Sequence, residues 1–415
     1  MLCLSRRVSL RRLTAAWALA MLFIAAGAAT AVAAELTYEI RLETAQEHDD
    51  GKFLWYHPRA AAFPDADGPA VVMTLQQHLH VSDYYSGLFE MRRPSLDGAW
   101  SGPTAIPELA WREQPNEATL AVCDVTPGWH APTKRLLAIG AQLPYSKEGS
   151  ILAGATPREH QTAYATYDPQ QNKWSGWQLL EMPADQKYDF SRNACAQWLT
   201  RADGKLLVPV YFGTSSKGPW SATVVECSFD GEELRYLSHG AEFDLNVERG
   251  LAEPSLVFFG GRYFLTMRND QRGYVSVSDD GLHFEPMRPW TFDDGEELGS
   301  YNTQQHWLAH SDGLLLIYTR RGANNDHIAR HRAPLFMAEV DPKTLQVIRR
   351  TERIVIPERG GELGNFGASA MNASESWITV SEGVWNDDAR QRGAKGATFV
   401  ARIIWSKPNK LAPFP

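Results

Sequence analysis

Short apolar runs alternate with turn residues over almost the whole chain. The runs are rich in Val, Leu, Tyr, Phe and Trp, and apolar residues at helical spacing are nearly absent. This pattern predicts β-strands, and an Asp-Gly or Gly-Gly pair between two runs predicts a hairpin. In LAEPSLVFFGGRYFLTMRND (251–270), two runs flank Gly260-Gly261. The strands would run antiparallel, so Glu253 and Arg268 should meet at one edge of the sheet.

The hairpins come in pairs that repeat along the chain. Turns that begin at Asp203, Gly260 and Asp312 are 57 and 52 residues apart, and each is followed by a second hairpin. Extending the repeat in both directions gives six units, at residues 55–100, 118–180, 195–240, 250–287, 304–350 and 364–405.

A four-stranded sheet repeated radially is the blade of a β-propeller. The sequence therefore predicts an all-β fold, a six-bladed β-propeller, or seven blades if an insertion hides a further unit. A decorated β-sandwich is the alternative. LTYEIRLET (36–44) is expected to add the closing strand to the last unit, which would remove two exposed strand edges.

The N-terminal segment, residues 1–34, has the pattern of a secretion signal peptide. Four arginines precede the apolar stretch LTAAWALAMLFIAAGAAT, and small residues follow it at a suitable cleavage point. SRRVSLRRL has a weak similarity to a twin-arginine signal, and a retained membrane anchor is the alternative. We expect a secreted or periplasmic protein in which residues 35–415 form a single propeller domain with no further membrane span.

Charge and cysteine content narrow the function classes. Loss of the signal would shift the formal net charge from −8 to −12, so the chain has no basic surplus for binding nucleic acid. The remaining Cys123, Cys195 and Cys227 form an odd set in apolar runs, which favours small buried side chains over a disulfide framework, with one bridge as the alternative. No cofactor or metal is expected, and the protein is expected to be a monomer.

Some second hairpins have an aspartate-glycine turn followed by an aromatic residue. SDDGLHF (278–284) is the clearest case, and SLDGAW (95–100) is another. The aspartate can accept hydrogen bonds from backbone N–H groups of the turn while the aromatic side chain packs beneath it. We interpret these turns as folding devices without a chemical role.

Aspartate turns of this kind on a six-bladed propeller resemble the sialidases, or neuraminidases. The resemblance covers most of the chain after the signal, and it implies a first-blade arginine, at Arg59 in WYHPRAAAFP. It also implies an acid/base aspartate, at Asp83 in HVSDYYSG, and a Glu-Pro motif before a hairpin that ends in a second arginine, as Glu253 and Arg268 do.

Two features of the family are less well matched. A third arginine would be Arg330 or Arg332 in HIARHRAPLF, or one of the pair in IYTRRG (317–322). The family's nucleophile is a tyrosine in the last blade, but the corresponding stretch LGNFGASAMN (363–372) contains Phe366 and no tyrosine. The covalent step of a retaining sialidase would therefore need another tyrosine.

The central end of the propeller is the expected binding site, because inner strands converge there. Arg59, Arg268 and the third arginine could grip one carboxylate with bidentate hydrogen bonds, which would select a sialic or uronic acid. Alternatively, each arginine pairs with a structural acid. The further candidates are His57, His80, Tyr301 and His306. All are expected at strand ends or in loops, where binding and catalytic residues are common. His78 and His80 are expected on one face of a strand, without a third metal ligand.

Three functions fit these residues. Our first prediction is a secreted glycoside hydrolase acting on an acidic oligosaccharide or polysaccharide, in which Asp83 protonates the leaving oxygen and Glu253 activates Tyr301 or water. The second is a lyase, similar to propellers that degrade ulvan, in which a histidine or tyrosine removes the C5 proton of a uronate. A propeller rhamnosidase family with one essential histidine is also similar, and His57 would be its position here. The third is an inactive carbohydrate-binding propeller.

Overall fold

The computed structural model describes residues 36–414 except 67, 82, 116 and 153–157. These residues belong to the unit Leu36–Pro415, and the predicted signal peptide lies outside them. None of the helices in this part of the chain is long and apolar enough to cross a membrane. The helices are α1 (Asp387–Gln391) and the 3-10 turns Pro107–Leu109, Gln186–Tyr188, Ala329–His331 and Arg349–Thr351.

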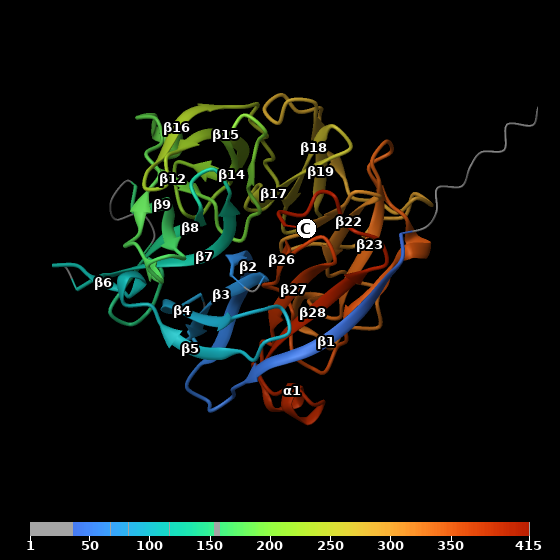
Figure 1. Ribbon diagram of the computed structural model, residues 1–415, viewed down its shortest axis with the longest axis horizontal. Helices are drawn as coiled ribbons and strands as arrows, with labels where there is room; N and C mark the ends of the chain where they lie inside the picture. The colour runs from blue at the N-terminus through green and yellow to red at the C-terminus, as the bar shows by residue number, and fades with distance from the viewer. Residues whose placement is uncertain (1–35, 67, 82, 116, 153–157, 415) are drawn as a thin grey trace, which may run out of the picture. The chain divides into compact units, whose positions relative to one another are not determined.

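The fold is all-β, and its sheets are arranged around a common centre as in a β-propeller (Figure 1). Within the described residues the strands form five sheets, four of which have four or five strands. The strands of these four sheets are β2 (Leu54–Asp65), β3 (Gly68–His78), β4 (Tyr85–Arg93) and β5 (Ser101–Ala105); β17 (Ala252–Phe259), β18 (Arg262–Arg268), β19 (Tyr274–Ser278) and β20 (Arg288–Pro289); β21 (His306–His310), β22 (Gly313–Tyr318), β23 (Leu335–Asp341), β24 (Gln346–Val347) and β25 (Arg353–Ile356); and β26 (Gly367–Ala370), β27 (Glu375–Ser381), β28 (Ala397–Trp405) and β1 (Tyr38–Glu47).

The fifth sheet has eleven strands because it joins two of the predicted units. β12 (Phe190–Arg192) pairs in parallel with β9 and antiparallel with β14, so the second and third units share one sheet. The predicted hairpin pairs are therefore present, but the separate sheets number fewer than six. The other strands of this sheet are β6 (Arg112–Glu113), β7 (Thr119–His130), β8 (Arg135–Tyr145), β9 (His160–Asp168), β10 (Lys173–Trp174), β11 (Gln178–Leu179), β13 (Leu199–Thr200), β14 (Leu206–Gly213), β15 (Ser221–Phe229) and β16 (Leu234–His239).

The first strand closes the fold as predicted. β1 pairs antiparallel with β28, with Tyr38 opposite Trp405 and Glu47 opposite Ala397. One sheet thus combines the two ends of the described chain, and the free edge of β28 is covered. Packing between neighbouring sheets supplies the core: Trp290 and Trp307, from either side of one such contact, are each 1% exposed. Many strands are consequently apolar on both faces.

The small side chains and turns behave as expected from the sequence. Cys123, Cys195 and Cys227 are free and buried. In the SDDGLHF turn, Asp280 accepts hydrogen bonds from the backbone N–H groups of Leu282 and His283, each at 2.8 Å. The aspartate therefore stabilises its own turn.

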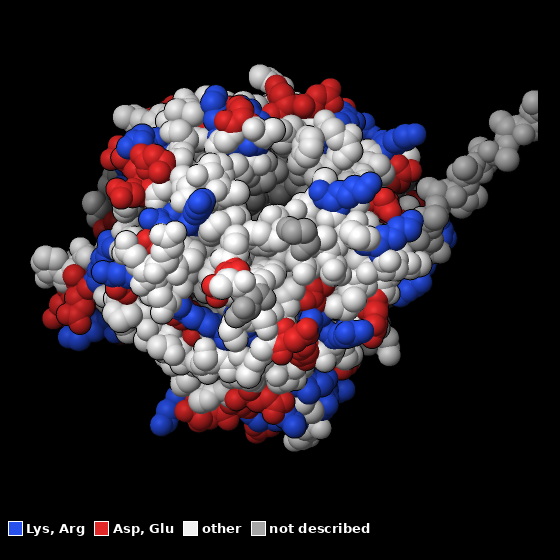
Figure 2. All heavy atoms as spheres, in the orientation of Figure 1, with Lys and Arg blue, Asp and Glu red and all other residues white. Residues whose placement is uncertain are grey.

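One face of the propeller has a hollow near its centre, with acidic and basic side chains interspersed around the periphery (Figure 2). Toward the C-terminal ends of the inner strands, a pocket of about 450 Å³ is bordered by Trp198, Phe258 and the C-terminal residues Leu411 and Pro413. The N-terminal ends of the same strands carry the residues of the candidate site.

Candidate active site

The inner strands converge on the axis and place polar side chains there. A small cavity of about 10 Å³, with room for about one water molecule, is lined from several sheets at once. Arg59 comes from β2, His306 from β21 and Gly367 from β26. Gln197 spans the cavity: its amide donates to the carbonyl oxygens of Trp307 (2.9 Å) and Ala368 (3.0 Å). Side chains far apart in sequence therefore meet at one axial point.

Four consecutive inner segments share an unusual backbone feature at this end. Each has a non-glycine residue in the left-handed region, and in β2, β7 and β17 that residue lies in a break of the strand register. Such bulges re-aim side chains, and strained residues cluster at functional sites. The four residues and their φ angles are His57 (54°), Asp124 (56°), Cys195 (53°) and Glu253 (47°).

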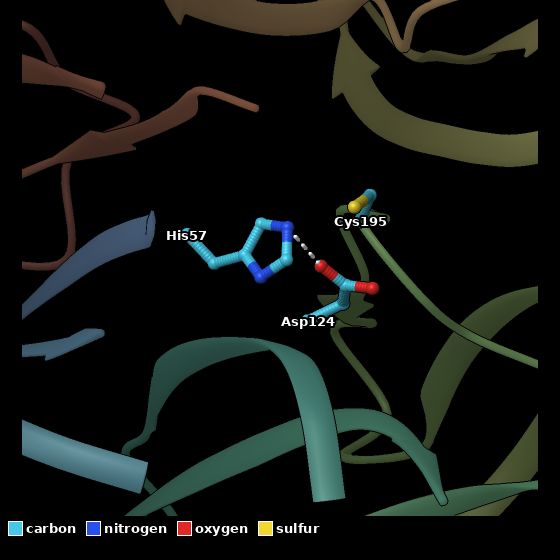
Figure 3. A group of neighbouring side chains, drawn as sticks. All are labelled: His57, Asp124 and Cys195. Atoms are coloured by element: carbon cyan, nitrogen blue, oxygen red, sulfur yellow. Dashed lines mark ion pairs between the residues drawn. The ribbon is translucent and has the colours of Figure 1, made fainter. Parts of the chain in front are cut away.

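His57, Asp124 and Cys195 form one group, in which His57 and Cys195 are buried and the Asp124 side chain is 14% exposed (Figure 3). Nε2 of His57 lies 2.8 Å from Oδ1 of Asp124. The Cys195 sulfur lies within 4.8 Å of a ring nitrogen of His57 and of a carboxylate oxygen of Asp124. Burial alone would raise the pKa of the Asp124 carboxyl, but His57 and the nearby charge of Arg59 hold that pKa well below its usual range. Burial and the Asp124 charge raise the pKa of the Cys195 thiol. The group thus holds a carboxylate beside an imidazole and a neutral thiol.

Arg59 is buried without a hydrogen-bond partner in the described part of the chain. Its side chain is 1% exposed, and none of its three guanidinium nitrogens has a hydrogen-bond partner among the described residues. A buried charge without hydrogen bonds is strongly unfavourable, so such a group needs a specific reason to be there. Several other buried polar atoms at this end also lack partners in the described chain, among them Nδ1 of His57, Oε2 of Glu253, Nε2 of His306 and Nε of Arg332.

Glu253 and Arg268 meet at the end of their hairpin, as the sequence predicts. Nη1 of Arg268 pairs closely with Oε1 of Glu253, and Nη2 donates to the side-chain oxygen of Asn302 at 2.9 Å. Nη2 of Arg332 donates to the main-chain oxygen of the same Asn302 at 2.5 Å and lies near Glu362, with 3.9 Å between Arg332 Nη1 and Glu362 Oε2. Asn302 therefore holds two arginines side by side.

The third arginine of the predicted cluster is Arg332. Arg332 is buried, at 6% exposed, whereas Arg330 is exposed and lies in a 3-10 turn with a positive φ of 55°. The alternatives in the sequence IYTRRG are engaged elsewhere: Arg320 makes a bidentate pair with Glu352, and Arg321 lies over the ring of Tyr301. The structure thus gathers Arg59, Arg268 and Arg332 at the axial end, and leaves Arg330 at the surface.

Asp83 lies on the rim of the same end, next to the His57–Asp124–Cys195 group. It is exposed, and the hydroxyl of Tyr85 donates to its Oδ1 at 3.3 Å. The Tyr85 ring lies 4.5 Å from the His57 ring, so one tyrosine connects the two predicted site residues. His80 is also exposed; β3 ends at His78, and the expectation that these two histidines share one strand face is wrong because His80 turns out of the strand with a φ of 58°.

Tyr301 and His306 have separate partners. The Tyr301 hydroxyl contacts Nδ1 of His331 at 2.6 Å. His306 is 1% exposed, and its Nδ1 lies 2.9 Å from Oγ of Ser255. Burial, with the charge of Arg59, lowers the pKa of His306 to about 3, so this imidazole is neutral. Phe366, at the position of the missing tyrosine, is fully buried against the His306 ring with 5.1 Å between ring centroids.

Sequence reasoning missed Asp124, Cys195 and Gln197. Asp124 had one visible signal, since it is a lone charge within the apolar strand β7. Cys195 and Gln197 had none, because a small thiol and an amide in an apolar hairpin are ordinary. Their positions depend on how β7 and the segment before β13 meet the axis.

Comparison with known proteins supports the fold. No known family's sequence model matches this chain, and no curated protein sequence matches it. Among solved structures the chain is similar to β-propellers of the sialidase type. It resembles Trypanosoma rangeli sialidase in complex with sialic acid, with 12% identity and a TM-score of 0.55 over 89% of this chain and 59% of that one. It therefore spans well under two thirds of the length of that protein.

Two further solved structures are similar to this chain in fold, also at low sequence identity. The NanB sialidase of Streptococcus pneumoniae has 10% identity and a TM-score of 0.56, over 88% of this chain and 70% of that one. The endosialidase of phage phi92 has 10% identity and a TM-score of 0.50, over 90% and 70% of the two chains. At these identities the likeness defines the sialidase-type propeller fold, and the chemistry must be argued from the site.

Proposed function

We propose that this protein is a secreted glycoside hydrolase that acts on a sugar bearing a carboxylate, with Arg59, Arg268 and Arg332 holding that carboxylate at the axial end. The observation that carries the proposal is Arg59. It is a buried guanidinium with no partner in the described chain, and a bound carboxylate would supply the missing charge and hydrogen bonds. The sialidase-type fold supports the same reading.

The hydrogen bonding within the cluster leaves Arg59 available to an anionic ligand. Glu253 is paired with Arg268, and Glu362 lies near Arg332, whereas Asp124 is paired with His57. Arg59 is thus the arginine of the cluster whose guanidinium has no hydrogen-bonded acid among the described residues. Guanidinium groups bind planar carboxylates bidentately, which gives both affinity and orientation.

The chemistry follows from the groups around this cluster. Asp83, at the exposed rim, donates a proton to the leaving glycosidic oxygen. With phenylalanine in place of the last-blade tyrosine, water attacks the sugar directly, which is a single displacement with inversion. Two buried atoms without partners in the described chain are candidates for taking the proton of that water: Oε2 of Glu253 and Nδ1 of His57.

The test is a screen against matched glycans. It uses the purified protein in the form that its host exports and processes. The panel contains sialosides, glucuronides, iduronides and galacturonides, each with its neutral analogue, and products are identified by mass. We expect release of the acidic sugar with addition of one water, and at least a 100-fold lower kcat/KM in Arg59→Met. Arg235→Met, at an exposed arginine paired with Asp230 and Glu233, is the matched control and should retain activity.

Other outcomes of the screen would support one of the alternative functions. A product with a new conjugated double bond and no added water would make the protein a lyase. Binding of acidic glycans without any product would make it a carbohydrate-binding propeller. Equal activity on acidic and neutral analogues, with Arg59→Met as active as the unchanged protein, would rule out the carboxylate clamp, that is, the binding of the sugar carboxylate by Arg59, Arg268 and Arg332.

A further inference from the structure

We propose that His57 and Asp124 form the proton-transfer pair of this site, with Nδ1 of His57 as the atom that takes the proton from the attacking water. The inference rests on the proposed hydrolase function for its substrate. It assigns a role to Asp124, which the sequence did not indicate, and it makes His57 a reacting group and not only a binding residue.

The close contact between the two residues favours one tautomer of the imidazole. Nε2 of His57 lies 2.8 Å from Oδ1 of Asp124, and an ionised carboxylate can only accept a hydrogen bond. A carboxylate oxygen this close repels a lone pair on Nε2, so the contact favours a hydrogen on Nε2, and in the neutral ring Nδ1 then holds the lone pair. Nδ1 is buried and has no partner among the described residues, so no other group of the described chain occupies its lone pair. The carboxylate behind the ring stabilises the imidazolium that then forms.

Asp124 is itself held in place from two sides. Its backbone N–H donates to Oε1 of Gln76 at 3.1 Å, and its carbonyl oxygen accepts from the backbone N–H of Cys195 at 3.3 Å. Gln76 is fully buried, and its amide donates to the carbonyl oxygen of Ser86 at 2.7 Å. A reacting pair needs this kind of support, because a misplaced base loses most of its effect.

The proposed proton donor, Asp83, lies on the other side of Tyr85 from His57. The ring of Tyr85 lies 4.5 Å from the His57 ring, and the Tyr85 hydroxyl donates to Asp83. His57 is buried and Asp83 is exposed, so the base lies on the inner side of Tyr85 and the acid on the outer side. An acid and a base on separate sides of a bound sugar are what direct attack by water requires.

Glu253 is the weaker candidate for this role. Its Oε1 is paired closely with Arg268, and a carboxylate neutralised by a guanidinium is a poor base. A metal ion is also a weaker account of the His57–Asp124–Cys195 group. Two ligands about 2.0–2.2 Å from one tetrahedral zinc ion lie roughly 3.3–3.6 Å apart. The 2.8 Å between Nε2 and Oδ1 is shorter than that separation.

The step balances without a cofactor. The water oxygen forms a bond to the anomeric carbon while one water proton moves to Nδ1 of His57. The glycosidic C–O bond breaks, and its electron pair stays on the leaving oxygen, which takes the proton of the Asp83 carboxyl. His57 then loses its proton to solvent and Asp83 regains one, so that the net change is the addition of one water.

The test compares His57→Gln, His57→Gly, Asp124→Asn and the control His283→Gln on the acidic glycan that the screen identifies. Glycine suits the left-handed backbone at position 57, and His283 belongs to an exposed His–Asp pair outside the axis. We expect kcat to fall about 10²- to 10⁴-fold in the His57 and Asp124 variants, with KM changed only a few-fold. Imidazole in the buffer should restore part of the activity of His57→Gly and none of Asp124→Asn.

A second readout does not need activity. Nitrogen-15 NMR of the histidine rings, with the His57 signal assigned by its loss in His57→Gln, should show hydrogen on Nε2 in the unchanged protein and a changed tautomer balance in Asp124→Asn. Hydrogen on Nδ1 would overturn the proposal. So would unchanged kcat in both His57→Gln and Asp124→Asn, or loss of activity to a chelator with recovery on addition of zinc. If the unchanged protein hydrolyses only neutral glycans and these variants abolish that activity, the pair stands and the carboxylate clamp fails.

Discussion

Gly367 leaves room for Arg59: a β-carbon at position 367 would lie 2.7 Å from Cγ of Arg59. Gly367 is the first residue of β26, and its backbone angles do not require glycine; the next atom that such a β-carbon would meet is Oγ1 of Thr379, at 3.1 Å. We therefore predict that Gly367→Ala pushes the Arg59 side chain out of place. The expected result is at least a tenfold rise in KM for the acidic glycan and a loss of about 1–3 kcal/mol in the free energy of unfolding.

Steady-state kinetics and urea denaturation of the variant check this prediction. Gly176→Ala is the control, because a β-carbon there would meet its nearest atom at an ordinary distance of 3.5 Å. An unchanged KM in Gly367→Ala would mean that the position of Arg59 does not matter for the substrate.

Arg59 itself should reduce stability while it supports function. Replacing it by methionine removes a buried charge that has no hydrogen bonds within the described chain and keeps most of the packing, so the unfolding free energy should rise by about 2 kcal/mol while activity is lost. Arg402 is the matched control, since it is also buried but makes a bidentate pair with Glu375. Arg402→Met should cost about 3 kcal/mol. If Arg59→Met is destabilised as much as the control, Arg59 has a structural partner and the clamp loses its main argument.

The strand arrangement was predictable because the pattern that sets it is local. Alternating apolar runs and turn pairs place the hairpins, and the antiparallel register then brings Ala252 opposite Arg268, with Glu253 beside it. The closing strand β1 follows from the same reasoning, because an uncovered edge of β28 would be unfavourable. What the pattern did not show is that β12 joins two units into one sheet, since parallel pairing of a three-residue strand leaves no periodic signal.

The site was only partly predictable, because backbone conformation aims its side chains. Left-handed residues are usually glycine or asparagine, so nothing in the sequence marks His57, Asp124 and Cys195 as left-handed positions near the axis. The choice between Arg330 and Arg332 depends on the loop after β22. There the Asn325 amide donates to three carbonyl oxygens, those of Arg320, His331 and Ala333, and this network fixes which arginine turns inward.

Stability should fall steeply below neutral pH because three buried histidines stay neutral in the folded chain. Burial is the first cause in each: it lowers the pKa of His78 to about 4 and, with nearby arginines, the pKa values of His160 and His306 to about 3. In the unfolded chain these groups bind protons below about pH 6.5. Between that pH and about 4 the unfolded state therefore binds more protons, and each histidine removes about 1.4 kcal/mol of stability per pH unit.

Urea denaturation at a series of pH values measures this slope. The three histidines together predict a loss of about 4 kcal/mol per pH unit, partly offset by relaxation of the fold. His160→Gln should reduce the slope by roughly a third, whereas His283→Gln, at an exposed side chain, should leave it unchanged. A flat stability profile from pH 7 to 5 would mean that these histidines are protonated in the folded protein.

Glu253 and His57 should differ in the kinetic constant that they control. Glu253 positions Arg268, so Glu253→Gln should raise KM for the acidic glycan by tenfold or more, because the guanidinium loses its closest anchor and, among the described residues, keeps Asn302 and Asp270. Its kcat should fall far less than that of His57→Gln, which removes the atom that accepts the proton. The comparison needs only initial rates over a range of substrate concentrations. If Glu253→Gln instead loses kcat as completely as His57→Gln while KM stays constant, Glu253 is the base that activates water and His57 serves to position it.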